Sequence, residues 1–191
     1  LSDADFIEKH VPLITGVAAQ VYRSAQLKYG NKNSNSTVRG TGKNYVRLAN
    51  FEIQRGRYFN QQEIIASKRI CVLGATVVKN LFEEANPLGK TIKVDGKNFI
   101  VIGTTEPKGA LSWYDPDDQI FIPVTTAQKR VFGMDHIQSI DVQAEKIDDL
   151  EKGLYTHLGK MEQLFPEVKS KELELLIKCM ALLLLINRVT V

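Results

Sequence analysis

The sequence predicts an α+β fold in which hairpin-forming strands are mixed with scattered short helices. Three observations predict it: apolar residues that recur with period two, turn dipeptides between strands, and helical stretches bounded by capping residues, glycine or proline. The regular βαβ succession of a doubly wound parallel sheet is not found. With 191 residues, 43% of them hydrophobic, the chain is long enough to bury a core.

The first forty residues predict a helix followed by two strands. Ser2-Asp3-Ala4-Asp5 has the form of a capping box, and the helix that it begins should end before Pro12. Residues 13–29 alternate between apolar and polar side chains, as a half-buried strand does. Residues 30–36 are rich in Gly, Asn and Ser, and we expect them to form a polar loop at the tip of a hairpin that joins two strands.

The middle of the chain carries the clearest hairpin signal. Residues 91–94 and 98–103 alternate on either side of Asp95-Gly96, a dipeptide that readily adopts the positive φ of a tight turn. Before them, residues 68–74 predict a buried strand, and residues 75–85 predict a helix that stops before Pro87.

A further strand is predicted at residues 119–123. Thr125 follows it as the start of a helix that Gly133 should end. Residues 137–144 again have the pattern of a strand. Residues 148–165 predict a capped helix, and residues 171–191 predict a third helical stretch that ends in a strongly apolar tail.

The charge argues against nucleic-acid binding, and the hydropathy predicts no membrane-spanning segment within these residues. The net charge of +3 is too balanced for a dedicated nucleic-acid binder, so we expect no nucleic acid as a partner. The longest unbroken apolar run spans residues 179–186, whereas a membrane-spanning helix needs roughly 20 apolar residues.

The two cysteines, Cys71 and Cys179, could form a single disulfide or remain free. The apolar surroundings of Cys71 favour a free thiol in the core.

Sequence motifs for catalysis and cofactor binding are incomplete. Gly89-Lys90-Thr91 resembles the end of a phosphate-binding loop, but Glu84 stands where that loop needs its first glycine. Gly40-x-Gly42 is followed by Tyr45 in place of the third glycine of a dinucleotide fingerprint. The sequence contains no motif for an activated serine or a catalytic zinc. We therefore predict no catalytic residue and no cofactor.

Metal binding has two candidates in the sequence, and both favour an ordinary structural interpretation. His10, His136 and His157 are widely separated and lack ligand spacing. Asp115-Pro116-Asp117-Asp118 offers several carboxylates, but Ile120 stands where a calcium loop needs glycine. A solvated turn explains the acidic run better, and we predict no metal site.

Several fragments, taken in order, resemble the extracytoplasmic core domain of MacB-like ABC transporter permeases and the related domains of FtsX-like and lipoprotein-release permeases. The similarity covers about Leu1 to Phe165. It is carried by Gly56-Arg57-Tyr58-Phe59, Val72-Leu73-Gly74, Asn86-Pro87-Leu88-Gly89-Lys90, Val101-Ile102-Gly103, Ile120-Phe121-Ile122-Pro123, Thr125-Thr126-Ala127 and Ser139-Ile140-Asp141-Val142-Gln143-Ala144. Among them, Gly89 and Gly103 suit tight turns or a close backbone approach, Pro123 suits a strand end, and Thr125 suits a helix start. For the charged Arg57 we expect a salt bridge or a carbonyl contact that holds the turn.

The resemblance implies one extracytoplasmic domain with two lobes. A mixed α/β lobe would comprise about residues 1–40 and 134–168, and a β-rich lobe of about residues 41–133 would be inserted into it. Residues 169–191 form the apolar tail, where the resemblance lapses. Its leucines would pack within the chain or against another copy. The start at Leu1 is expected for a segment that follows a first membrane helix.

The resemblance also implies a function. It suggests a non-catalytic domain on the periplasmic side of the bacterial inner membrane that relays ATP-driven motion to a partner or substrate. The partners would be the ATPase subunit or domain of the same transporter, a periplasmic adaptor or lipoprotein, and a second copy in a dimeric transporter. The alternative is an independent module that binds a small ligand or lipid, which a deep apolar pocket would identify.

The segment from Lys108 to Asp118 is the candidate for contact with a partner. It is a long loop that contains the only tryptophan, and its candidate contact residues are Lys108, Trp113 and Tyr114. The alternative is that Trp113 and Tyr114 fold back onto the core.

Overall fold

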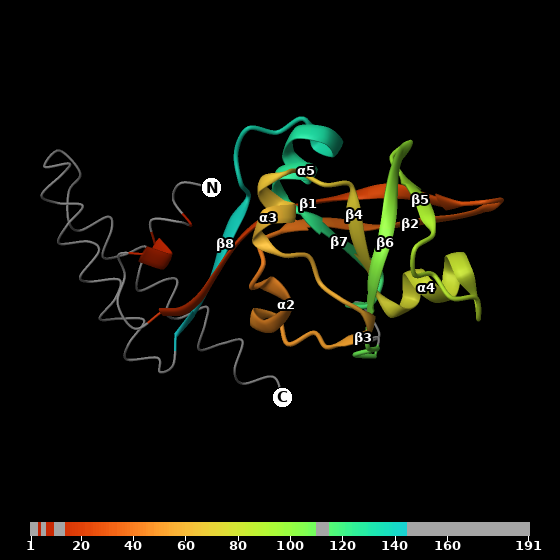
Figure 1. Cartoon of the computed structure of the whole chain (residues 1–191), viewed down its shortest axis with the longest axis horizontal. Coiled ribbons are helices and arrows are strands. Elements are labelled where there is room, and N and C mark those ends of the chain that lie inside the picture. Colours follow the sequence, from red (N-terminus) through yellow and green to blue (C-terminus); the bar gives the residue numbers. More distant parts are fainter. Residues whose placement is uncertain (1–3, 5–6, 10–13, 110–114, 145–191) are drawn as a thin grey trace, which may run out of the picture. The chain divides into compact units, whose positions relative to one another are not determined.

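The computed structural model describes residues 4, 7–9, 14–109 and 115–144 (Figure 1). It confirms the α+β class. The strands are β1 (Ile14–Tyr29), β2 (Lys32–Thr41), β3 (Ile53–Gly56), β4 (Ile70–Leu73), β5 (Thr91–Val94), β6 (Lys97–Thr105), β7 (Gln119–Pro123) and β8 (Ser139–Ala144). The helices are α2 (Tyr45–Leu48), α3 (Gln61–Ile65), α4 (Ala75–Phe82) and α5 (Val124–Thr126), which continues as the π-helix η1 (Ala127–Phe132).

The chain divides into two compact units. One is formed by Val17–Asp141 and the other by Ser2–Gly16 together with Val142–Val191. Within the second unit, the hydroxyl of Thr15 donates a hydrogen bond to the carbonyl of Gln143 at 3.2 Å. The first unit contains most of the described residues, including the base of the loop that is the candidate for partner contact.

Six strands of the first unit form a closed ring of pairings, in the order β1, β2, β7, β4, β6, β5 and back to β1. The β1–β2 hairpin is antiparallel over ten residue pairs, while β2 pairs with β7 and β4 pairs with β6 in parallel. β8 pairs with β1, and β3 pairs with β6. Strand pairing in this unit therefore joins segments that lie far apart in the sequence.

The two faces of the β1–β2–β7 layer are covered by different helices, with α5 on one side and α2 on the other (Figure 1). On the α5 side, a Cβ at Gly40 would overlap the side chains of Ala127 and Val21, so glycine is needed for close packing. On the α2 side, the ring of Phe121 packs against those of Tyr45 and Phe51, with ring centroids 5.8 and 5.1 Å away. Both faces of β7 are consequently buried.

The local predictions with the strongest turn chemistry are confirmed. Asp95 and Gly96 both have positive φ, 48° and 77°, and join β5 to β6 as a tight hairpin. Gly133 ends η1 in the left-handed conformation, as predicted for the end of that helix. The predicted strands at residues 13–29, 68–74, 119–123 and 137–144 correspond to β1, β4, β7 and β8, and the predicted helix at residues 75–85 corresponds to α4.

The predicted hairpin between two strands at residues 30–36 is confirmed, but its loop is shorter than predicted. The turn consists of Gly30 and Asn31, and β2 begins at Lys32. Asn33 and Asn35 belong to the strand because their backbones pair with Lys28 and Gln26 of β1, while both asparagines remain exposed. Three short elements, α2, β3 and α3, lie between residues 42 and 67, a segment for which we made no prediction from the sequence.

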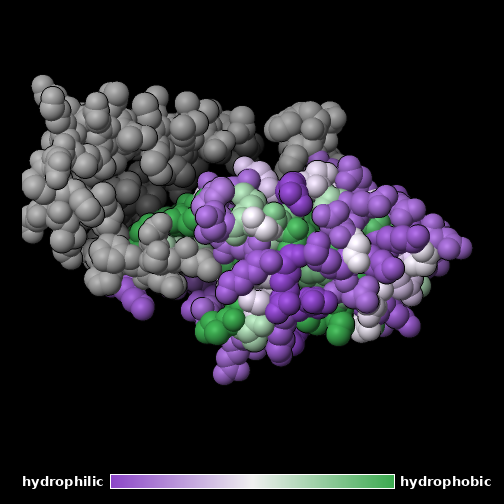
Figure 2. All heavy atoms as spheres, turned by 90° about the horizontal axis from the view of Figure 1, so that it is seen from above, coloured by the Kyte–Doolittle hydropathy of each residue, from purple (hydrophilic) through white to green (hydrophobic). Residues whose placement is uncertain are grey.

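The two-lobe boundaries stay a prediction. β1 and β2, which belong to the first predicted lobe, pair with β5 and β7 of the second. No helix in the described part of the chain is both long and apolar enough to cross a membrane. The predicted helix at residues 148–165 and the tail of residues 169–191 lie outside the described residues. In the face seen in Figure 2, the described part of the surface is mostly hydrophilic, with separate smaller apolar areas.

Candidate functional site: the base of the loop at residues 106–118

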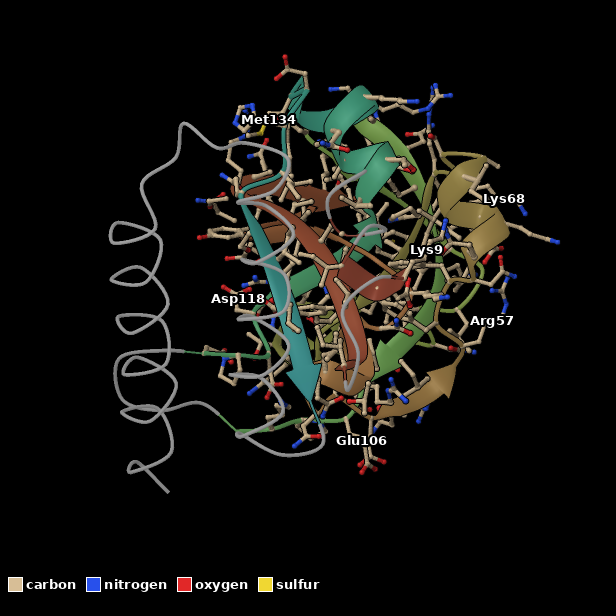
Figure 3. The ribbon with its side chains drawn as sticks, turned by 90° about the vertical axis from the view of Figure 1, so that its left-hand side faces the viewer. Lys9, Arg57, Lys68, Glu106, Asp118 and Met134 are labelled. Atoms are coloured by element: carbon tan, nitrogen blue, oxygen red, sulfur yellow. The ribbon has the colours of Figure 1, made fainter. Side chains whose placement is uncertain are left out.

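The carboxylate of Asp117 ties together the two described arms of the candidate partner-facing loop. It accepts hydrogen bonds from the backbone N–H of Lys108, at 3.1 and 2.9 Å, and of Gly109, at 3.0 Å. Asp117 is buried, with 3% of its surface exposed. Because two backbone donors meet one buried carboxylate, the base of the loop is held in one arrangement. Figure 3 marks the two arms by Glu106 and Asp118.

A proline turn gives Asp117 its position. Asp118 N–H donates to the carbonyl of Asp115 at 3.3 Å, and Pro116 occupies the turn position that its fixed φ favours. One oxygen of the Asp115 carboxylate accepts from Asp117 N–H at 2.8 Å, and the other accepts from the Thr76 hydroxyl at 2.7 Å. The acidic run is therefore joined to the start of α4.

The turn explains the acidic run without a cation. Asp115 and Asp117 use their carboxylates on backbone and hydroxyl donors, as the interpretation as a turn predicts. Among the described residues, no group of three or more His, Cys, Asp or Glu side chains is arranged to hold a metal ion. His136 hydrogen-bonds to its neighbour Asp135 at the surface, while His10 and His157 lie outside the described residues.

Lys108 is the one predicted contact residue within the described part of the chain. Its ammonium lies 4.0 Å from the centroid of the Phe51 ring and donates a hydrogen bond to the carbonyl of Ala49. Partial burial lowers the pKa of Lys108, and the charge of Asp117 opposes that shift. Lys108 thus anchors the first arm of the loop beside the end of α2. Trp113 and Tyr114 lie outside the described residues, so their role stays a prediction.

Arg57 has the structural role that the sequence favoured. Its guanidinium forms two hydrogen bonds of 2.8 Å with the Glu63 carboxylate, and it also donates to the carbonyl of Tyr58 at 3.1 Å. Lys68 approaches the same carboxylate at 3.5 Å, and Arg57 and Lys68 lie on the same side of the domain in Figure 3. Glu63 is 4% exposed, and the hydrogen bonds from Arg57 lower its pKa to about 2.

The Arg57 site also fixes α3. Asn60 and Glu63 form a reciprocal capping box, in which each side chain accepts from the other residue's backbone N–H. This Asn-x-x-Glu spacing is visible in the sequence and is the signal that could have predicted α3. The hydroxyls of Thr125 and Thr126 donate to the carbonyls of Ile64 and Lys68, which ties the end of α3 to α5.

Cys71 is a free, buried cysteine in β4. Burial raises the pKa of its thiol, so the reactive thiolate is disfavoured. The structure therefore agrees with the expectation of a small core residue.

The fold and these contacts define an α+β domain in which charged side chains hold turns and short helices in place. Residues 1–153 match the family described as MacB-like periplasmic core domain. Two relatives are the macrolide export ATP-binding/permease proteins MacB of Chlorobium luteolum and Chlorobium phaeobacteroides. The first is 36% identical over 85% of this chain and 25% of its own length, and the second is 40% identical over 74% and 22%.

Solved structures share the fold. The periplasmic region of MacB from Actinobacillus actinomycetemcomitans matches with a TM-score of 0.72 at 23% identity, over 93% of this chain and 81% of that one. The extracellular domain of the ABC-type transporter YknZ from Gram-positive bacteria matches with a TM-score of 0.69 at 21% identity, over 80% and 76%. The chain belongs to the family of MacB-like periplasmic core domains, which are extracytoplasmic parts of membrane transporters. It spans about a quarter of the length of the curated relatives that it matches.

Proposed function

We propose that this chain is a non-catalytic relay in the periplasm, attached to a permease of the bacterial inner membrane. The domain carries ATP-driven motion from the cytoplasmic side to an extracytoplasmic partner or substrate. The observation that carries the proposal is the family match over residues 1–153, because the family is defined by its place in a transporter. Rigid-body displacement of a domain is a common way to transmit such motion.

The described contacts support a mechanical role. A relay must keep its shape under load, and a closed ring of strand pairings with fixed turns does so. Arg57 and Glu63 hold α3 through hydrogen bonds between charged side chains. The charged carboxylate of Asp117 holds the loop base by accepting hydrogen bonds from backbone N–H groups. The loop that starts at Lys108 would then present Trp113 and Tyr114 to the partner.

The assembly that we propose around the domain comes from its relatives. They are named ATP-binding/permease proteins, which supports an ATPase domain or subunit as the source of motion. A second copy of the permease and a periplasmic adaptor or lipoprotein complete the proposed assembly. The relay itself needs no cofactor.

The relay is tested in the full-length permease reconstituted in proteoliposomes, with a radiolabelled macrolide as the probe because the relatives are named for macrolide export. We expect Trp113→Ala together with Tyr114→Ala to lower transport at least about fivefold while ATP hydrolysis stays within about twofold of wild type. The control is Ile65→Ala, which removes an apolar side chain that is 71% exposed on α3. Equal loss of hydrolysis and transport, or no loss of either, would contradict the proposal.

A further inference from the structure

Arg39, near the C-terminal end of β2, connects the two neighbouring strands through its side chain. Its Nε donates to the side-chain oxygen of Gln119 at 2.9 Å, and its Nη1 donates to the side-chain oxygen of Gln20 at 2.7 Å. The rings of Tyr22 and Tyr45 lie 5.0 and 5.6 Å from the guanidinium carbon. The guanidinium is thus held by two hydrogen bonds and by contacts with two aromatic rings.

Strand register makes this geometry possible. Arg39 pairs with Tyr22 of β1 and with Phe121 of β7, so Gln20 and Gln119 are its diagonal neighbours on the same face. Diagonal neighbours lie within reach of a long side chain. From its position in β2, the side chain of Arg39 therefore contacts both neighbouring strands, β1 and β7.

The two glutamines extend the connection in opposite directions. The side-chain nitrogen of Gln119 donates to the carbonyl of Pro116 at 2.6 Å, inside the turn that positions Asp117. On the other side, the backbone carbonyl of Gln20 accepts from the N–H of Gln138 at 2.9 Å, directly before β8. Gln138 is held a second time, because its side-chain oxygen accepts from Tyr22 N–H at 2.5 Å. We call Gln20, Arg39, Gln119 and the Pro116 carbonyl the Arg39 network.

Stability alone does not explain a network of this kind. Gln20 and Gln119 are each 3% exposed, and burying polar groups costs free energy that apolar side chains of similar size would avoid. Both of these hydrogen bonds from Arg39 go to neutral amides, while the charge of Asp141 acts on it from β8. A buried polar network whose groups all have hydrogen-bond partners rigidifies the strands that carry it and favours one arrangement of them.

We infer that Arg39 is a positioning residue whose network couples the β8 side of the sheet to the base of the loop at residues 106–118. The inference rests on the proposed relay, because it supplies the route by which a displacement at β8 reaches the loop. From Gln138, which directly precedes β8, each link is a direct hydrogen bond: Gln138 to Gln20, Gln20 to Arg39, Arg39 to Gln119, and Gln119 to the Pro116 turn.

The test is amide hydrogen exchange in the 191-residue chain, measured at the backbone amides of Lys108 and Gly109. Gln20→Leu is the informative variant, because the network connects Gln20 to the loop through Arg39, Gln119 and the Pro116 turn. We expect Gln20→Leu and Arg39→Met to raise the exchange rates of these two amides at least about tenfold. Exchange at Ile120 and Ile122 in β7 serves as the internal reference for global unfolding.

Two further variants keep the test decisive. Arg23→Met is the matched control, since Arg23 also lies in the β1–β2 hairpin but contacts Phe132 and Asp95, outside the network. We expect it to leave the loop amides within about twofold of wild type. Where Arg39→Met does not fold, Gln119→Glu keeps the acceptor for Arg39 and removes the donor to Pro116, and it should raise loop exchange in the same way.

The inference is overturned if the loop amides keep their wild-type rates in Gln20→Leu, or if their rates rise only in step with those of Ile120 and Ile122. Measuring both exchange and transport distinguishes failure of the Arg39 network from failure of the proposed relay. Unchanged loop exchange in Gln20→Leu, together with loss of transport in the Trp113 and Tyr114 variant, overturns the network but not the relay. Raised exchange in Gln20→Leu together with unchanged transport in that variant supports the network and overturns the relay.

Discussion

The guanidinium of Arg57 and the carboxylate of Glu63 are joined by two hydrogen bonds of 2.8 Å, and Glu63 as a whole is only 4% exposed. Paired hydrogen bonds between ionised groups are stronger and more directional than those between neutral groups. This pair holds α3 against the strand end at Gly56, and so connects the segment after β3 to the rest of the domain.

Glu63→Gln should destabilise the domain by about 2 kcal/mol, because it removes the charge-assisted bonds to Arg57 and weakens the capping box with Asn60. The measurement is the free energy of unfolding from urea denaturation. Glu84→Gln is the control, since Glu84 is exposed after α4, and it should change stability by less than about 0.5 kcal/mol. Equal effects of the two substitutions would contradict the account of Arg57.

The same carboxylate predicts a pH dependence. The pKa of Glu63 is lowered from its ordinary value of 4.5 to about 2, chiefly by the hydrogen bonds from Arg57. A depressed carboxyl pKa contributes stability that is present above the unfolded value and is lost as the pH falls through the folded value. The stability difference between wild type and Glu63→Gln should therefore shrink between about pH 4.5 and pH 2. A difference that stays constant over that range would exclude this linkage.

Two buried threonines should respond in opposite ways to replacement by valine. The Thr126 hydroxyl donates to the carbonyl of Lys68 at 2.8 Å, so Thr126→Val should cost about 1–2 kcal/mol. The Thr105 hydroxyl is buried and finds no hydrogen-bond partner among the described residues, so Thr105→Val should be neutral or stabilising by up to about 1 kcal/mol. Both are measured by thermal and urea unfolding. Destabilisation by both variants to the same extent would show that the hydroxyls are equivalent.

Gly74 lies against the loop base, and a Cβ there would overlap the carbonyl oxygens of Asp117 and Gln119. Gly74→Ala should cost about 1–3 kcal/mol, because backbone atoms cannot move aside cheaply. Gly42→Ala is the matched control, since its Cβ would meet its nearest neighbour at an ordinary 3.8 Å. The midpoint of urea unfolding distinguishes them, and a Gly74→Ala midpoint equal to that of Gly42→Ala would refute the close approach.

Elements with strong local chemistry could be predicted from the sequence. The Asp95-Gly96 turn needs positive φ at both residues, and few other dipeptides supply it, so β5 and β6 followed directly from it. β7 was equally clear, because its short, mostly apolar run is buried on both faces. The resemblance to the transporter family rested on residues of this kind.

Elements that depend on tertiary contacts could not be predicted in the same way. β2 contains Asn33, Ser34 and Asn35, whose polarity indicates a loop, but ten residue pairs with β1 outweigh that preference. β3 has four residues and is held by its pairing with β6, which no local pattern reveals. At the loop base, Asp115 and Asp117 were recognised as turn formers, but their partners Thr76 and Lys108 come together only in the fold.

The most direct test of a passive relay is a pair of distance measurements by pulsed electron paramagnetic resonance on the full-length permease, with and without ATP. Spin labels at Lys28→Cys and Lys129→Cys, both exposed, report the distance within the domain, and a label at Lys129→Cys alone reports its distance from labelled lipid headgroups. We predict that ATP changes the domain-to-bilayer distance and leaves the distance within the domain constant to about 2 Å. A change within the domain as large as the change relative to the bilayer, or no ATP-dependent change in either, would contradict the account.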